Sequence, residues 1–179
     1  MIQELFDAAG VPWWMDYGML LGAVRNPMLG VPPGMIPHDK DGDIGVLATH
    51  IDQVHALRPA FQQRGFGWVW RGPSGDASKV GYGGGNRWKI RTSEINHTNI
   101  DVFPWYERED GLMYRIRYIG YDRYKGREFP RSRLLPLVEM EWEGLLLPAP
   151  ADPEWFVEHR YGPNWRTPID KHEGDGQKR

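Results

Sequence analysis

The stretch PHDKDGDIGV, residues 37–46, places three aspartates at alternate positions directly before an apolar run that starts at Ile44. Side chains two residues apart on a strand point to the same face. If a strand begins near Asp41, then Asp41 and Asp43 share one face, while Ile44 and Val46 turn to the other face, toward a core. Like charges repel, so the stretch is either a solvated turn or a place where a positive group binds.

A hard cation fits the second explanation. Mg²⁺ takes oxygen ligands, keeps some of its waters and completes its shell with phosphates. A third carboxylate is available in NIDVFPWY, residues 99–106, where Asp101 stands between Ile100 and Val102. A charge inside an apolar strand is costly unless it is paired or bound to metal. Asp101 is therefore a candidate for a shared two-ion site, or else an exposed edge residue or the partner of an arginine.

A strand-to-helix turn precedes these acids in DYGMLLGAVR, residues 16–25. The expected strand stops at Gly18 and a helix follows. The first turn of a helix presents free N–H groups and a partial positive charge, which favour phosphate. On its own, a glycine between a strand and a helix usually marks an ordinary turn.

The remaining pattern alternates between short helical and extended segments. Early helices followed by mostly antiparallel strands indicate an α+β domain. Asp152, followed by Pro153 and Glu154, is typical of a helix start. We expect helices at residues 2–9, 19–25, 51–63 (with Pro59 inside), 131–135 and 153–160. We expect strands at residues 13–17, 43–47, 67–71, 87–91, 99–105, 112–118 and 138–147, with a turn between hairpin arms at 74–85 and a loop at 26–41.

Composition excludes several classes of protein. The chain has 179 residues, 40% of them hydrophobic and 26% charged, which suits one globular domain. The net charge of −2 gives no support to a nucleic-acid surface. Cysteine is absent, so thiol chemistry and disulfides are excluded. No run is long enough for a membrane span and the start does not resemble a secretory signal, so we expect a cytoplasmic protein without a transmembrane segment.

Five motifs in this order resemble the LicD family of phosphocholine and sugar-alcohol phosphotransferases, which includes fukutin-like proteins. They are WWMDYGMLLGAVR (13–25), IPHDKDGDIGV (36–46), NIDVFPWY (99–106), YKGREFPRSRLLPL (124–137) and EWEGLLLPAPADPEWFVEHRYGPNWRTP (141–168). The resemblance implies a nucleotidyltransferase-like mixed β-sheet flanked by helices. It covers nearly all of a single domain at residues 1–168, and we expect residues 169–179 to form a polar, flexible tail.

Residue by residue, the resemblance assigns roles to matching positions. Asp41 and Asp43 would bind the catalytic metal, Mg²⁺ or Mn²⁺, and Asp101 would be the third catalytic and metal-binding carboxylate. Gly18 and the helix after it would hold phosphate. Arg25 and Asp39 occupy matched positions and are expected to line the substrate site.

Three positions depart from the pattern of the family. Lys40 replaces an acid and Gly42 replaces an apolar residue, although the pair Asp41 and Asp43 is retained. Met19 stands where the family usually has serine or threonine, so no hydroxyl is available there to contact phosphate.

The resemblance implies a Mg²⁺-dependent transferase that moves phosphocholine or a polyol phosphate from a CDP-linked donor to a glycan or similar hydroxyl acceptor, as in the modification of cell-surface glycans. In RWKIR, residues 87–91, Arg87, Lys89 and Arg91 alternate on one face, and Lys89 is a candidate to bind the donor phosphate. His97 is a candidate base or an exposed loop residue.

Aromatic residues offer stacking partners for the donor, with core packing as the alternative; these are Trp13, Trp14, Trp105 and Tyr106. Two other functions stay open. One is a nucleotidyltransferase that moves NMP from NTP to a small acceptor, and the other is a catalytically silent protein that binds a nucleotide or sugar.

Overall fold

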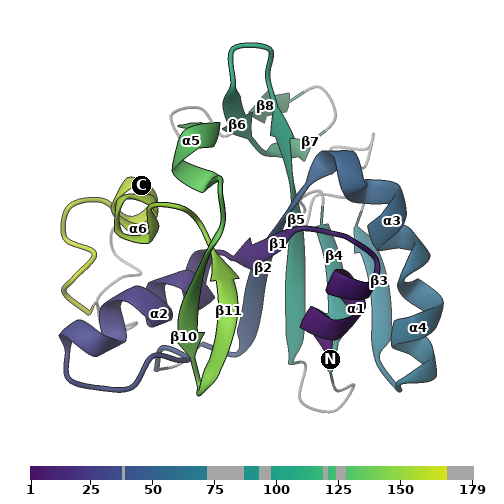
Figure 1. Ribbon diagram of the computed structural model, residues 1–179, viewed down its shortest axis with the longest axis horizontal. Helices are drawn as coiled ribbons and strands as arrows, with labels where there is room; N and C mark the ends of the chain where they lie inside the picture. Colours follow the sequence, from purple (N-terminus) through teal and green to yellow (C-terminus); the bar gives the residue numbers. More distant parts are fainter. Residues whose placement is uncertain (38, 72–86, 93–97, 119–120, 124–127, 169–179) are drawn as a thin grey trace.

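A mixed β-sheet forms the centre of the protein, seen in a computed structural model that describes residues 1–37, 39–71, 87–92, 98–118, 121–123 and 128–168 (Figure 1). The helices of these residues are α1 (Ile2–Ala8), α2 (Tyr17–Met28), η1 (Ala48–His50), α3 (Ile51–Ala56), α4 (Arg58–Gln63), α5 (Arg131–Leu134) and α6 (Pro153–Tyr161). The strands are β1 (Trp13–Met15), β2 (Asp41–Leu47), β3 (Gly67–Arg71), β4 (Arg87–Arg91), β5 (Asn99–Glu107), β6 (Leu112–Tyr114), β7 (Ile116–Tyr118), β8 (Tyr121–Arg123), β9 (Phe129–Pro130), β10 (Val138–Trp142) and β11 (Leu145–Ala149).

The main sheet has the strand order β1-β2-β5-β4-β3, and β6 and β9 extend it from β5. The pair β2 and β5 is parallel, whereas β1–β2, β5–β4 and β4–β3 are antiparallel. Figure 1 shows α3 and α4 beside β3 at one edge, with α2 and α6 beyond β2 at the other. The expected α+β class with a mixed sheet flanked by helices is confirmed.

The core lies on the sheet face opposite the aspartates. Ile44 and Val46 of β2, Trp88 and Ile90 of β4 and Val102 of β5 are almost completely buried there. Aromatic rings join the first helix to this layer, because Phe6 of α1 contacts Trp13 and Phe61 edge to face. This alternation of apolar and polar positions along each strand fixes which face the charged residues occupy.

Several elements differ from the sequence prediction at identifiable points. The strand expected at residues 13–17 ends at Met15, because Asp16 caps α2 with its side chain. The helix expected at 19–25 runs from Tyr17 to Met28, with Pro27 in its last turn, which shortens the expected loop. The helix expected at 51–63 divides near Leu57, since Pro59 cannot donate to a preceding carbonyl.

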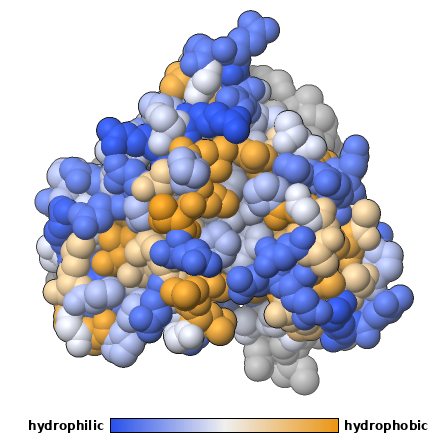
Figure 2. Space-filling view, viewed as in Figure 1, coloured by the Kyte–Doolittle hydropathy of each residue, from blue (hydrophilic) through white to orange (hydrophobic). Residues whose placement is uncertain are grey.

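The strand expected at residues 138–147 is a hairpin. Trp142 pairs with Leu145, so Glu143 and Gly144 form a two-residue turn, and both have positive φ, 51° and 77°. Figure 2 shows apolar side chains on the face where Figure 1 places β10–β11, and Leu145 and Leu146 are 56% and 58% exposed.

Four expectations are not tested by the described residues. The turn expected at residues 74–85 falls entirely outside the described residues, although β3 and β4 pair antiparallel. The flexible tail at 169–179 also lies outside them. Among the described residues, no helix combines the length and apolar character that a membrane span requires. The single domain at residues 1–168 and the cytoplasmic location stay predictions.

Close packing of α2 against the loop before β2 positions the N-terminus of this helix. A Cβ atom added at Gly22 would lie 2.0 Å from the carbonyl oxygen of Gly34. The same oxygen accepts a hydrogen bond from Asn26 Nδ2 at 3.1 Å. Only glycine at position 22 allows this approach.

We therefore expect Gly22→Ala to lower the free energy of unfolding. Overpacking costs roughly 1–3 kcal/mol, and here it exceeds the roughly 1 kcal/mol of helix propensity that alanine gains. Urea denaturation measures the change. In the comparison variant Gly42→Ala, the new Cβ would meet the sulfur of Met19 at 3.0 Å. This sulfur belongs to a flexible side chain that can move, so Gly42→Ala should lose less stability than Gly22→Ala. A Gly22→Ala protein as stable as the wild type would contradict this packing.

Candidate active site

Three charged side chains form a row across three neighbouring strands. The parallel register pairs Asp43 of β2 with Asp101 of β5, and the antiparallel register pairs Asp101 with Lys89 of β4. Asp41 pairs with Asn99 one step away along the same face. Because directly paired residues of adjacent strands point the same way, Asp41, Asp43 and Asp101 share one face of the sheet.

Asp43 carries the least compensated charge of this row. Burial, and then the nearby charges of Asp16, Asp41 and Asp101, raise the pKa of its carboxyl from 3.8 to about 8. The backbone N–H of Gly18 opposes this rise and donates to Asp43 Oδ2 at 3.4 Å. A carboxyl held in this way has a strong tendency to gain either a proton or a cation.

Gly18 permits a second carboxylate to approach the start of α2. A Cβ atom at position 18 would lie 2.2 Å from Asp39 Oδ2. In this structure the first turn of α2 therefore faces the carboxylates of Asp39 and Asp43. The phosphate-binding role expected for Gly18 stays a prediction, as does the substrate-lining role of Asp39.

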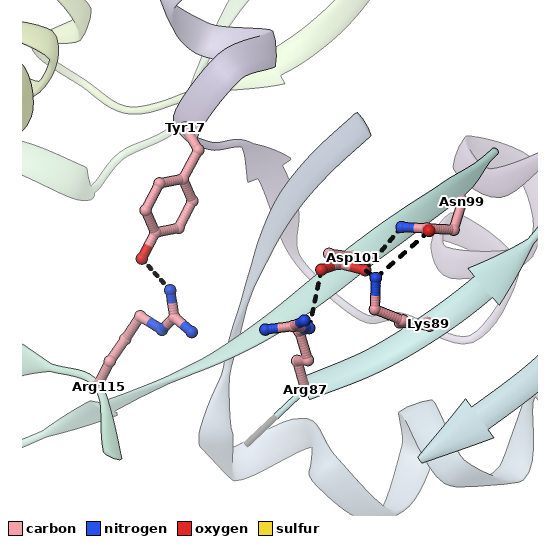
Figure 3. Close-up of polar contacts among 6 residues, drawn as sticks. All are labelled: Tyr17, Arg87, Lys89, Asn99, Asp101 and Arg115. Carbon is pink, nitrogen blue, oxygen red and sulfur yellow. Dashed lines mark hydrogen bonds and ion pairs between the residues drawn. The ribbon is translucent and has the colours of Figure 1, made fainter. Parts of the chain in front are cut away.

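Asp101 is held by two cations from β4 (Figure 3). Its Oδ2 lies 2.8 Å from Arg87 Nε and its Oδ1 lies 3.0 Å from Lys89 Nζ. Asn99 donates to Asp101 Oδ1 at 2.8 Å and accepts from Lys89 at 3.3 Å. Burial raises the pKa of Asp101, and the charges of Arg87 and Lys89 oppose that rise. The arginine partner considered for Asp101 from the sequence is present, together with a lysine.

Asp16, which the sequence analysis did not assign to the site, organises its edge. Its side chain is 1% exposed and accepts hydrogen bonds from the N–H of Tyr17 at 2.9 Å and from Trp105 Nε1 at 2.9 Å. Arg160 of α6 forms an ion pair with it at 3.3 Å. An aspartate directly before a helix is an N-cap signal, but its arginine partner lies 144 positions along the chain and gives no local signal.

Tyr17 and Arg115 form a second cationic group near the row. Tyr17 has a positive φ of 40° at the strand-to-helix turn. Its hydroxyl is hydrogen bonded to Arg115 NH1 (Figure 3). The guanidinium of Arg115 lies 3.9 Å from the ring centre of Phe103, and that of Arg87 lies 5.8 Å from the same centre. Arg87 and Arg115 thus flank one aromatic ring of β5.

Arg25 lies apart from the carboxylates. It sits two turns along α2 from Gly18, is 8% exposed and donates to the carbonyl oxygen of Trp165 at 3.5 Å. Burial lowers the pKa of its guanidinium. This position anchors the segment after α6, and the substrate-binding role expected of Arg25 stays a prediction.

The aromatic candidates divide into buried and accessible groups. Trp13, Trp14 and Trp105 are at most 3% exposed, so they pack in the core and cannot stack on a ligand in this conformation. Tyr106 is half-buried and packs against Tyr114, with ring centres 5.7 Å apart. His97 lies outside the described residues.

Two of the departures from the family pattern are in contact. A Cβ atom at Gly42 would lie 3.0 Å from the sulfur of Met19 and 3.3 Å from Ile100 Cγ1. The Met19 side chain, 6% exposed, occupies the volume that a larger residue at position 42 would need. The small residue at 42 therefore makes room for the long side chain at 19 within one packed layer, and neither change alters the face that carries the aspartates.

The three metal ligands expected from the sequence, Asp41, Asp43 and Asp101, do not form a ready-made ion site in this structure. Within the described ranges, no three carboxylate or imidazole groups are arranged to hold an ion together, and Asp101 is occupied by Arg87 and Lys89. The chemistry of Asp41 and Asp43 nevertheless fits a hard divalent cation. They supply two oxygen donors on one strand face, and the raised pKa of Asp43 shows that negative charge there lacks compensation.

A pocket of about 430 Å³ lies at the opposite ends of the same strands. Leu47 at the end of β2, Trp105 and Glu107 of β5 and Arg131 of α5 contribute to its lining. Leu47 is four residues beyond Asp43, or about 13 Å along an extended strand. The row of charges is therefore outside this pocket.

Comparison with known proteins gives a family match over most of the chain. The sequence model for "LicD/FKTN/FKRP, nucleotidyltransferase domain" matches residues 10–152. The ribitol 5-phosphate transferases FKRP of Mus musculus and Homo sapiens are each 32% identical over 164 residues, which is 89% of this chain and 29% of theirs. The chain thus spans less than a third of the length of these relatives.

More distant similarities extend to bacterial proteins. An uncharacterised protein of Rickettsia typhi is 26% identical over 168 residues, covering 90% of this chain and 43% of its own. Among solved structures, the lincosamide antibiotic adenylyltransferase LnuA superposes with a TM-score of 0.49 at 17% identity, covering 84% of this chain and 76% of that chain.

The raised pKa of Asp43 predicts how stability depends on pH in the metal-free protein. A carboxyl whose pKa is higher in the folded state binds its proton more tightly there. Its stabilising effect is therefore fully present below about pH 4 and is lost as the pH rises through about 8. Asp43→Asn removes this loss, so the variant should gain stability over the wild type across that interval, by at most about 1.4 kcal/mol per pH unit.

Urea denaturation in EDTA at pH 5 and pH 8.5 measures this gain. The control Asp52→Asn changes an exposed aspartate of α3 and should track the wild type at both values. A difference between Asp43→Asn and wild type that is the same at both values would show that Asp43 titrates normally.

Proposed function

Because the chain belongs to the LicD/FKTN/FKRP family, we propose that it is a phosphotransferase domain that moves a phospho-alcohol from a CDP-linked donor to a hydroxyl acceptor. The relative is named a ribitol 5-phosphate transferase, which favours a polyol phosphate over phosphocholine as the transferred group. The observation that carries the proposal is the row of Asp43, Asp101 and Lys89 beside the first turn of α2. The row has, on one face, the carboxylates that a metal would need and the cations that phosphate would need.

Asp41 and Asp43 would hold Mg²⁺ or Mn²⁺, and such an ion supplies charge neutralisation on the diphosphate. Lys89 and Arg87 stand on the other side of Asp101 and are positioned to bind phosphate oxygens. The N–H groups at the start of α2 add a partial positive charge. Together these groups orient the diphosphate across the row, which is the main task of a phosphotransferase.

The reaction forms a bond between the acceptor oxygen and the phosphorus of the polyol phosphate. The bond between that phosphorus and the oxygen of the second phosphate breaks, and CMP leaves with the electron pair. Asp101 is the proposed acceptor of the hydroxyl proton, because it lies beside Asp43 and reaches the same face. A glycan or another polyhydroxylated molecule is the proposed acceptor.

The two alternative functions predict different outcomes. A nucleotidyltransferase would release pyrophosphate from an NTP and leave NMP on the acceptor, whereas the proposed enzyme releases CMP. The silent binding protein stayed open because of Met19, Lys40 and Gly42, but the mutual packing of Met19 and Gly42 supports a volume exchange that does not touch the aspartates.

Asp43→Asn should reduce transfer more than about 100-fold, because a lost metal ligand removes several kcal/mol of charge stabilisation in the transition state. The assay incubates the protein with Mg²⁺, CDP-ribitol or CDP-choline and a glycan acceptor, and detects CMP and product mass. Asp52→Asn is the control and should retain transfer. Circular dichroism verifies that Asp43→Asn is folded. Wild-type-like transfer by Asp43→Asn would remove this residue from the mechanism, and an NTP-derived product would favour the nucleotidyltransferase.

A further inference from the structure

Two cations share one carboxylate in the row, while the adjacent carboxylate has none. Arg87 and Lys89 both contact Asp101, whose side chain is 6% exposed. Asp43, in direct register beside it, has no arginine or lysine partner among the described residues. The β4 side of the row thus carries an excess positive charge and the β2 side an excess negative charge.

The partners of Asp101 are suited to a different ligand. Phosphate oxygens accept charge-assisted hydrogen bonds from guanidinium and ammonium groups as carboxylates do, and a diphosphate offers more acceptors and more charge. The side chains of Arg87 and Lys89 are 15% and 16% exposed, so each is reachable from the open face. A diphosphate on this face would compete with Asp101 for both of them.

We propose that Arg87 and Lys89 are the donor-phosphate ligands of this site and that Asp101 holds them in the donor-free state, so that binding of the donor releases Asp101 for the metal side of the row. The inference rests on the proposed function for the identity of the donor. Beyond the phosphate contacts already proposed for Arg87 and Lys89, it adds the exchange of their partner Asp101, and it makes Asn99 a positioning residue that contacts both Lys89 and Asp101 (Figure 3).

This exchange of partners couples two binding events. Without donor, Arg87 and Lys89 form ion pairs with Asp101, and their positive charges repel a metal cation beside it. With donor, Arg87 and Lys89 bind the phosphates instead, and the carboxylate of Asp101 becomes available to the metal. Because such coupling is reciprocal, the metal must strengthen donor binding by the same factor by which the donor strengthens metal binding.

The central test needs the metal alone. Mn²⁺ affinity is measured by isothermal titration, without donor, for the wild type, Lys89→Gln and Arg91→Gln. Arg91 lies on the same face of β4 and provides a control that removes an equal charge. We expect Lys89→Gln to bind Mn²⁺ at least ~5-fold more tightly than the wild type, the lower end of typical coupling factors, and Arg91→Gln to change less than twofold.

A comparison in the Asp101→Asn background separates release of Asp101 from a general loss of positive charge. The double variant Asp101→Asn with Lys89→Gln should show no gain in Mn²⁺ affinity over Asp101→Asn alone, because the released carboxylate no longer exists. A gain that persists in the double variant, or equal effects of Lys89→Gln and Arg91→Gln, would overturn the proposal. Arg87→Gln, which should act in the same direction as Lys89→Gln, replaces it if that variant does not fold.

The donor arm distinguishes failure of this inference from failure of the proposed function. CDP-ribitol should tighten Mn²⁺ binding more in the wild type than in Lys89→Gln. Equal tightening in both proteins would reject the exchange while leaving the proposed function intact. Absence of any CDP-alcohol binding or CMP release by the wild type would reject the proposed function, and the metal-only comparison would still decide whether Asp101 is held closed by Lys89.

Discussion

The parallel pairing of β2 with β5 is the constraint on which the rest of the site depends. Antiparallel neighbours surround this pair, yet its register alone sets Asp43 directly beside Asp101. A shift of one residue would turn one of these acids to the apolar face, where Ile44 and Val102 now pack. The apolar residues that pack on the core face therefore fix the register of the two strands, and with it the positions of the acids on the charged face.

The charged face has two halves of opposite sign. Asp39 and Asp43 lie at the start of α2 and Asp41 lies near Asp43, while Arg87 and Lys89 lie beyond Asp101. A metal-bound diphosphate has the same division of charge, with a cation on one side and phosphate oxygens on the other. The same distribution of charge therefore accounts for the raised pKa of Asp43 and for the ion pairs of Asp101, and it suits the proposed transfer reaction.

Local patterns in the sequence were sufficient to find the three acids on the sheet face but not the contacts between distant segments at the edge of the site. The alternate spacing of Asp41 and Asp43 and the apolar flanks of Asp101 located these residues, and the structure brings all three to one face as expected. The ion pair of Asp16 with Arg160 and the contact of Tyr17 with Arg115 join distant segments. No periodicity or spacing encodes such pairs, because they arise only when α6 and the β6–β7 region pack beside α2. The two-residue turn at Glu143 and Gly144 likewise fell inside a segment expected to be one strand, residues 138–147.

Anomalous diffraction from crystals grown with Mn²⁺ and CDP-ribitol would reveal the proposed binding mode of metal and donor, since Mn²⁺ is a visible substitute for Mg²⁺. For this binding mode we expect a peak about 2.1 Å from carboxylate oxygens of Asp41 and Asp43, with Arg87 and Lys89 in contact with the diphosphate. A donor bound with no ion at these two aspartates, or an ion bound only elsewhere on the protein, would contradict it.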